Sequence, residues 1–222
     1  MPVFMEILRS VFVISRLFTA CTFACASAAC GPAPEAPSAS DVAAYFGISD
    51  GARFAYRNEN GASEEHTYVR NTTFADKEAF DREVRRGGFL QDDAVFTVEA
   101  TMEGLSLIRF FDCLRQCGET SAPIPMMSWP LVPGERLAST VTVTIDRDGE
   151  ITTEEQTHAF QLAGASENVE TQAGSFEGYA LIWTRTVSGE TQTSQLVFVP
   201  EVGFVVNEWF DGVRFELEES SD

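Results

Sequence analysis

The chain has 222 residues, which is enough for one domain of ordinary size once an N-terminal leader is set aside. Hydrophobic residues make up 44% of it and the formal net charge is −19, so a packed core is compatible with the composition, while the acidic surface argues against binding to nucleic acid or anionic membranes. Lys77 is the single lysine of the sequence, which leaves one candidate for a lysine-based active site.

The first 29 residues have the pattern of an export signal. Arg9 and Arg16 precede an uncharged apolar run over 17–29 that ends in small residues. This is the order of a positive segment, an apolar segment and a cleavage zone. The run is short for a transmembrane span. A leader that ends at residue 29 is therefore predicted, and an amphipathic N-terminus or a misassigned start codon is the alternative.

The segment Ser27-Ala28-Ala29-Cys30 resembles the lipobox of bacterial lipoproteins. In that family the cysteine is diacylated and becomes the new N-terminus, so the resemblance implies attachment to a membrane through lipid on Cys30. In similar lipoproteins a glycine after the cysteine, here Gly31, goes with delivery to the outer membrane. Two alternatives stay open: lipidation at Cys21, and ordinary cleavage after Ala28 to give a soluble secreted or periplasmic protein.

The leader is followed by a tether and then by one domain. Residues 30–40 contain the candidate anchor cysteine and a stretch rich in Pro, Ala and Ser, which has no means of burying surface. Residues 41–222 are predicted to form a single antiparallel β domain.

Cys113 and Cys117 are the two cysteines of this domain. An even pair in an oxidising compartment favours a disulfide. Residues four apart in a regular strand are too distant for a bond, so the chain has to turn between them. Metal binding is the alternative, but no further Cys or His lies nearby in the sequence to complete a tetrahedral site.

Alternation of apolar and polar residues predicts strands through most of the domain. A short turn over 41–46 comes first, and 52–58 and 65–70 are predicted to form a hairpin around Asn60-Gly61. Residues 76–86 differ, because acidic residues come early, arginines come late and two glycines follow. These start and stop signals predict a short surface helix.

The middle of the domain contains a proline-rich stretch between predicted strands over 94–102, 105–111 and 136–147. The four prolines of residues 117–134 predict a crossover that passes over the sheet, with Trp129 closing an end of the core.

The segment from Asp146 to Glu150 predicts a hairpin turn rather than a calcium loop, because the third acidic ligand and the distal glutamate are missing. The polar residues of the strand that follows, 151–162, predict that it is exposed or lies at an edge.

Further strands are predicted at 166–172, 176–187, 190–199, 204–210 and 213–217. This spacing, with turn signals in between, indicates a mainly β fold: a curved antiparallel sheet or a partly open β-barrel with one short surface helix. The buried face is marked by the alternation of Val141, Val143 and Ile145, of Phe96 and Val98, and of Val213, Phe215 and Leu217.

Two C-terminal motifs resemble a pattern of uncharacterised bacterial envelope lipoproteins. Residues 173–179 read A-G-S-F-E-G-Y and residues 199–205 read V-P-E-V-G-F-V, similar to the G-[TS]-F-x-x-Y and P-x-V-G-x-V of that family. Segments 45–56 and 130–134 match two further motifs, whereas Phe198 stands where Trp or Tyr is usual. The resemblance implies a curved sheet, partly closed as in the lipoprotein-carrier proteins, and brings no activity with it.

The residues provide no recognisable catalytic set. His66 and His158 are the only histidines, and neither lies in a metalloprotease or α/β-hydrolase motif. No Gly-rich phosphate loop is present, and neither a cofactor nor a metal is predicted. The favoured hypothesis is a lipid-anchored, non-enzymatic envelope protein that binds an apolar ligand or a protein partner.

A ligand site is expected between the sheet and the proline-rich crossover near Trp129. The candidate ligand-binding residues are the aromatic residues Trp129, Phe176, Tyr179, Trp183, Phe198 and Trp209. An acid–base hydrolase with two carboxylates in the concave face of the sheet and a purely structural surface lipoprotein are the alternatives. Buried, converging carboxylates would favour the enzyme, and an apolar groove would favour binding.

Overall fold

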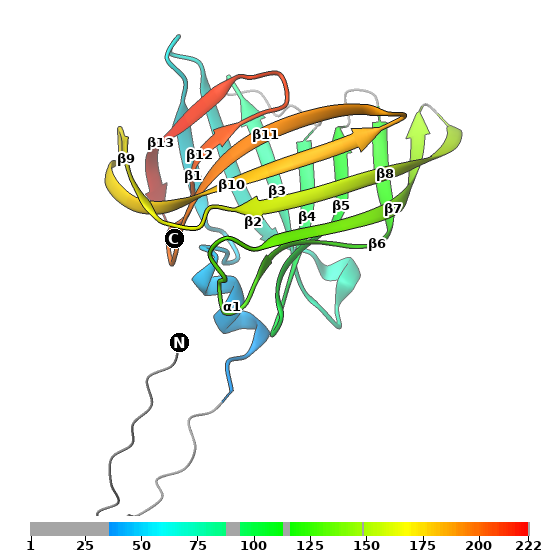
Figure 1. Ribbon diagram of the computed structural model, residues 1–222, viewed down its shortest axis with the longest axis horizontal. Coiled ribbons are helices and arrows are strands. Elements are labelled where there is room, and N and C mark those ends of the chain that lie inside the picture. Colours follow the sequence, from blue (N-terminus) through cyan, green and yellow to red (C-terminus); the bar gives the residue numbers. More distant parts are fainter. Residues whose placement is uncertain (1–35, 88–93, 113–115, 148, 222) are drawn as a thin grey trace, which may run out of the picture. The chain divides into compact units, whose positions relative to one another are not determined.

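Thirteen antiparallel strands and one short α-helix make up the computed structural model (Figure 1), which describes residues 36–87, 94–112, 116–147 and 149–221. The elements are α1 (Ala39–Tyr45), β1 (Arg53–Arg57), β2 (Ser63–Arg70), the 3-10 helix η1 (Thr72–Phe74), β3 (Glu78–Arg86), β4 (Ala94–Thr101), β5 (Gly104–Asp112), β6 (Gln116–Ser128), β7 (Arg136–Arg147), β8 (Glu150–Leu162), β9 (Glu167–Thr171), β10 (Gly174–Val187), β11 (Glu190–Val199), β12 (Gly203–Glu208) and β13 (Arg214–Ser221). No helix among these residues is long and apolar enough to cross a membrane.

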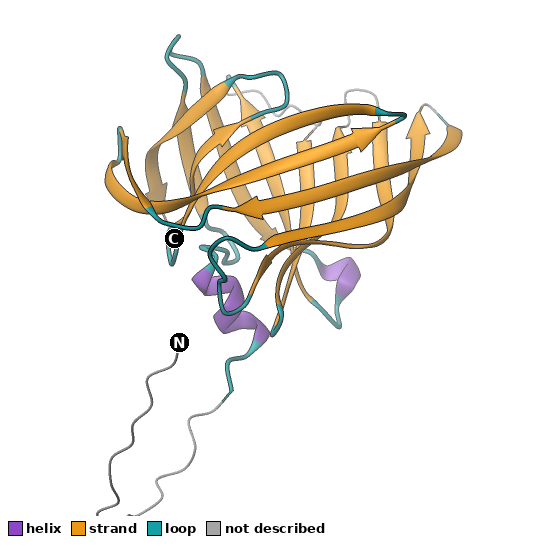
Figure 2. Cartoon of the chain, viewed as in Figure 1, coloured by secondary structure: helices purple, strands orange, loops and turns teal. Residues whose placement is uncertain are grey.

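The strands close into a barrel. Their order is β11-β12-β13-β1-β2-β3-β4-β5-β6-β7-β8-β10-β9, and β10 also pairs with β11. Twelve strands therefore form a closed ring, and β9 pairs with the first residues of β10 alone. Figure 2 shows how little of the described chain is helical. The predicted mainly β, barrel-like fold with one short helix is confirmed, although this helix is not the segment that the sequence pattern indicated.

The helix lies at the start of the domain. Ser38 caps α1, because its hydroxyl accepts from the backbone N–H of Asp41 and the Asp41 carboxylate accepts from Ser38 in return. Val42, Ala43 and the cap residue Phe46 are buried in the core, so α1 covers one end of the barrel (Figure 1). The prediction of a simple turn over 41–46 was wrong, since it overlooked this capping box.

The predicted surface helix over 76–86 is instead strand β3, which pairs with β2 and β4. Phe80, Arg82 and Val84 point into the barrel and are 2%, 7% and 2% exposed. These three positions have the period of two that a strand requires. The prediction was wrong because a charged residue occupies the middle position, which broke the apolar alternation.

The predicted crossover over 117–134 is mostly strand β6, and only residues 129–135 connect it to β7. Pairing between β6 and β7 is confined to Cys117–Thr120. Beyond that point β6 pairs with β5 alone, with register shifts. A strand with one free side has positions where a missing N–H costs no ladder bond, and this explains why Pro123 and Pro125 are tolerated in it.

Strand β8 covers the residues 151–162 that were predicted to be exposed or to lie at an edge, and only its first half does so. Its second half pairs with β7 and β10, whereas its first half pairs with β7 alone. The prediction of an exposed or edge strand is thus wrong for the second half, where Phe160 is 1% exposed. The turn that leads into β8 is confirmed by the bond from Gly149 N to Asp146 Oδ1, at 2.9 Å; residue 148 lies outside the described residues.

The predicted buried face is largely confirmed. Val141, Val143 and Ile145 are 3%, 0% and 7% exposed, and Phe215 and Leu217 are also buried. Val98 is buried and Phe96 packs against the core. The exception is Val213, which lies in the loop before β13 and is 36% exposed.

Gly178 marks a close contact between neighbouring strands. A Cβ atom at this position would lie 2.9 Å from the carbonyl oxygen of Phe198 and 2.9 Å from Val197 Cγ1. Gly178→Ala is therefore expected to destabilise the domain by about 1–3 kcal/mol, measured by urea unfolding. Gly164→Ala is the matched control, because nothing lies within 4 Å of its added Cβ. Equal unfolding midpoints for the two variants would contradict this reading of the contact.

Candidate functional site

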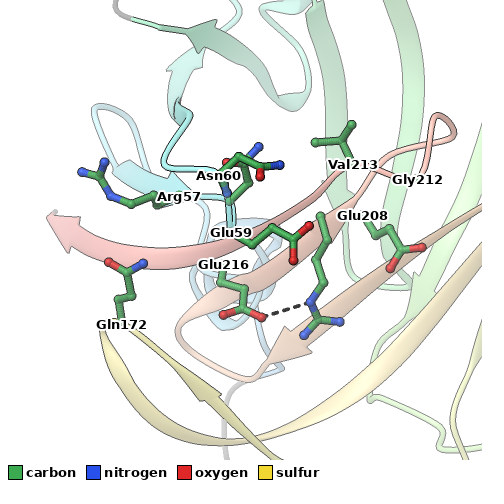
Figure 3. A pocket seen from close by; sticks show the side chains of 10 residues that line it. Arg57, Glu59, Asn60, Gln172, Glu208, Gly212, Val213 and Glu216 are labelled. Carbon is green, nitrogen blue, oxygen red and sulfur yellow. Dashed lines mark hydrogen bonds and ion pairs between the residues drawn. The ribbon is translucent and has the colours of Figure 1, made fainter.

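An open cleft of about 470 Å³ lies at the tips of three hairpins (Figure 3). The β1–β2 turn contributes Asn58, Glu59 and Asn60 to its wall, the β9–β10 turn contributes Gln172, and the β12–β13 connection contributes Gly212. This volume falls within the usual range for ligand sites. No local pattern in the sequence indicates the cleft, since its walls come from turns near residues 60, 172 and 212, which are far apart in the chain.

Charged side chains of both signs line this cleft. Arg57 binds Glu218 through Nε and Nη2 at 2.9–3.0 Å, and Arg214 Nε donates to Glu216 at 3.0 Å. Glu59 and Glu208 also line the cleft, and among the described residues neither carboxylate forms an ion pair. Both arginines are thus compensated already, which leaves the cleft with a surplus of negative charge.

A second group of polar residues lies inside the barrel, around His66 on β2. His66 is 1% exposed, its Nε2 donates to the Glu64 carboxylate, and its Nδ1 accepts from Arg82 Nε at 3.1 Å and Nη2 at 2.7 Å. Arg82 Nη2 also donates to Asn207 Oδ1 at 2.7 Å. Both ring nitrogens of His66 are therefore occupied, so the imidazole has no free nitrogen to act as a catalytic base.

The carboxylate of Glu64 is held by several donors. Arg86 Nε donates to it at 2.8 Å and Trp209 Nε1 lies 3.2 Å from both of its oxygens. Burial acts to raise the pKa of Glu64, but the hydrogen bond and charge of His66, together with Arg86, outweigh it and lower the pKa. Burial, and then the charge of Arg82, lower the pKa of His66 to about 4. At neutral pH the pair is an ionised carboxylate beside a neutral imidazole, and Glu64 is poorly suited to act as a general acid.

The other histidine forms a separate cluster on β8. His158 is fully buried; its Nδ1 accepts from Trp183 Nε1 at 3.2 Å and its Nε2 lies 3.0 Å from Gln156 Oε1. Burial, and then the charge of Arg185, lower its pKa to about 4. Both histidines lie on strands with their side chains in the interior of the barrel.

Between these two clusters lies a small internal cavity. Its volume is about 20 Å³, which is room for about one water molecule. Eleven of its fourteen lining residues have neither a hydroxyl group nor a charge, and the others are Tyr68, Arg82 and Ser194. The apolar members are Ile48, Phe96, Val98, Leu105, Leu107, Met126, Phe160, Trp183, Leu196, Phe204 and Trp209.

Two of the six aromatic candidates, Trp183 and Trp209, line this cavity. Phe198 is fully buried and packs against Phe46 instead, with ring centroids 5.4 Å apart. Trp129 packs against Tyr45 with centroids 4.4 Å apart, in the region that α1 covers.

The remaining two candidates, Phe176 and Tyr179, are half-buried on β10. None of the four lines the cavity, so the structure separates residues that the sequence analysis had grouped. The cavity lies between the two tryptophans rather than beside Trp129.

The predicted modifications fall on other segments. Cys30 and Cys113 lie outside the described residues, so lipidation and the disulfide stay predictions. The predicted reversal of the chain near the cysteine pair is confirmed, because Asp112 of β5 pairs antiparallel with Gln116 of β6. Among the described residues, no group of three or more His, Cys, Asp or Glu side chains is placed to hold a metal ion.

Two solved structures are similar to the chain. One is a Bacteroides fragilis protein with a YmcC-like fold, provisionally named as exported; it is 12% identical, with a TM-score of 0.48, and the match covers 80% of this chain and 99% of that one. The other, from Parabacteroides distasonis, is provisionally named a lipoprotein; it is 13% identical, with a TM-score of 0.45, over 80% of this chain and 98% of that one. No family model and no curated protein matches the sequence.

Proposed function

We propose that this is an exported, lipid-anchored envelope protein that acts by binding, and that its hairpin-tip cleft receives a protein partner. The cleft of about 470 Å³ is the observation that carries the proposal, because the barrel interior leaves room for about one water molecule. Its surplus of glutamates favours a partner segment rich in arginine or lysine. The leader, Cys30 and the proline-rich tether support attachment to the outer membrane.

The anchor is tested by Cys30→Ser in the native host. We expect the variant to move from the membrane fraction to the soluble fraction, because without acyl chains inserted into the bilayer no hydrophobic contact holds the protein there. Cys21→Ser serves as the control and should still be found with membranes. A Cys30→Ser protein that stays in the membrane fraction would place the anchor elsewhere.

The cleft is tested by calorimetric titration with a short arginine-rich peptide. Glu59→Gln combined with Glu208→Gln should weaken binding by about fivefold, since exposed charge pairs contribute about 0.5 kcal/mol each. The matched control combines Glu150→Gln with Glu190→Gln, which removes two exposed carboxylates at the starts of β8 and β11, outside the cleft. If the control weakens binding equally, the peptide is responding to the net charge of the protein and the cleft proposal fails.

The internal cavity supports a second candidate function, the binding of an apolar ligand inside the barrel. Its lining is mostly apolar with few polar groups, which is the usual composition of a small-molecule site. A ligand with a long tail would require the lining residues to move apart. Quenching of tryptophan fluorescence by an apolar probe, lost in Trp183→Phe, would support this candidate.

The hydrolase alternative has less support. The buried carboxylate of Glu64 is engaged by His66, Arg86 and Trp209 and its pKa is lowered, whereas a general acid needs a raised one. A purely structural role would leave both the cleft and the cavity without ligands.

A further inference from the structure

We propose that the internal cavity binds the carboxylate group of a ligand, held by Arg82 and Tyr68. The proposal rests on the second candidate function, binding inside the barrel, and names the chemical class of that ligand. It is independent of the hairpin-tip cleft.

Arg82 is a buried cation with donors to spare. It is 7% exposed and lines the cavity. Its Nε and Nη2 donate to His66 and Asn207, but Nη1 makes no hydrogen bond with any described residue. No carboxylate among the described residues forms an ion pair with Arg82. A buried guanidinium without a direct counterion is costly unless an anion meets it.

Tyr68 supplies a further donor to the same cavity. It is 4% exposed and lines the cavity beside Arg82, and its hydroxyl makes no hydrogen bond with any described residue. Burial raises the pKa of this phenol, so that it stays protonated and able to donate. Buried hydroxyl groups usually have a partner, and an anion bound at Arg82 would provide one.

The local charge balance selects a monoanion. Next to the cavity, Arg86 pairs with the buried Glu64 carboxylate, and Arg82 donates to Nδ1 of His66, which is neutral at pH 7. The cluster therefore has one positive charge in excess, which a single carboxylate would balance. Phe96, Phe204 and Trp209 flank the Arg82 guanidinium at 5.6–5.9 Å from their centroids, so the group next to the carboxylate meets apolar surface.

The carboxylate could come from two sources. A small free carboxylate such as acetate would require only a small widening of the present cavity, whereas a fatty acid would place its head at Arg82 and would need the apolar lining to open around its tail. Titrations of the full-length protein with acetate, dodecanoate and dodecanol, followed by tryptophan fluorescence below the concentrations at which these amphiphiles self-associate, distinguish the sources. Trp183 and Trp209 line the cavity and report on its occupation.

We expect dodecanoate to bind at least tenfold more tightly than dodecanol at pH 7.5. Tyr68→Phe, which removes the free hydroxyl and keeps the ring, should weaken dodecanoate binding at least fivefold and leave dodecanol unchanged, because a hydrogen bond to a charged group is stronger than one to a neutral group. Tyr179→Phe is the matched control, since Tyr179 does not line the cavity. Arg82→Gln should abolish the preference for dodecanoate if the variant folds, as judged by circular dichroism.

Each remaining outcome decides between the ideas. Binding of acetate with an affinity equal to that of dodecanoate, and sensitive to Tyr68→Phe, would keep the site and identify its ligand as a small free carboxylate. Equal affinity for dodecanol and dodecanoate would confirm binding inside the barrel and overturn the carboxylate assignment. Failure of all three compounds to bind would overturn both binding inside the barrel and the carboxylate assignment. An unchanged affinity for dodecanoate in Tyr68→Phe would overturn the role of that residue and the site proposed around it.

Discussion

Replacing Glu64 with Gln is expected to lower the free energy of unfolding by about 3 kcal/mol. The carboxylate is 1% exposed and accepts from His66, Arg86 and Trp209. Removing one partner of a buried ionic network leaves the others desolvated without compensation, which typically costs about 3–5 kcal/mol. The side-chain amide of the new glutamine would also point its own N–H groups at the donors of His66, Arg86 and Trp209. Urea unfolding at pH 7.5 measures the change in free energy. In a thermal melt, the melting temperature is expected to fall by roughly 6–12 °C.

Glu65→Gln is the matched control for this prediction. Glu65 is the next residue of β2 and its side chain points to the outer surface of the barrel, so removing its charge should change stability by less than about 0.5 kcal/mol. If Glu64→Gln is as stable as this control, the buried network contributes nothing measurable to the fold.

Acidification is expected to destabilise the domain between about pH 6.5 and pH 4. His66 and His158 are both buried, and the pKa of each is lowered to about 4 from an ordinary value of 6.5. In this pH window the unfolded chain binds protons that the folded protein excludes, so stability rises with pH and is lost as the pH falls. A shift of this size corresponds to about 3 kcal/mol for each histidine. The lowered pKa of Glu64 adds to the loss at the acidic end, as the carboxylate becomes protonated.

The slope of stability against pH separates the histidines from other titrating groups. His158→Gln should roughly halve the loss between pH 6.5 and pH 4, whatever its effect on stability at pH 7.5, because one of the two buried imidazoles is gone. Urea unfolding at four pH values across the window provides the slope. A free energy of unfolding that is constant from pH 7 to pH 5 would contradict the expected burial of neutral imidazoles.

The error at residues 76–86 shows where pattern reading failed. Acidic residues before arginines and two glycines after them are helix signals, but they are also compatible with a strand whose ends are exposed. Alternation of Phe80, Arg82 and Val84 was the competing signal. Arginine is rarely buried, so Arg82 does not extend an apolar face in the sequence, and this residue is the one that marks the proposed carboxylate site.

The candidate sites were even less accessible from sequence. Glu64 and His66 lie two apart on β2, which is a visible hint that both side chains share one face. Their partners Arg82 and Trp209 come from β3 and the β12–β13 connection, and Asn207 of β12 accepts from Arg82 in turn. No local signal in the sequence connects these residues. The hairpin-tip cleft likewise joins turns near residues 60, 172 and 212, each of which is an ordinary turn on its own.

Local patterns were sufficient to establish that the chain has a mainly β domain, where most of its strands and turns lie, and which face of β7 is buried. Alternation and turn residues act over a few neighbouring positions, so they are legible along the chain. Barrel closure through the pairing of β1 with β13, the burial of Arg82, and the positions of the cleft and cavity were decided by tertiary structure alone. These features depend on which strands meet across the ring, and the burial of a charge is stable only when distant residues supply its partners.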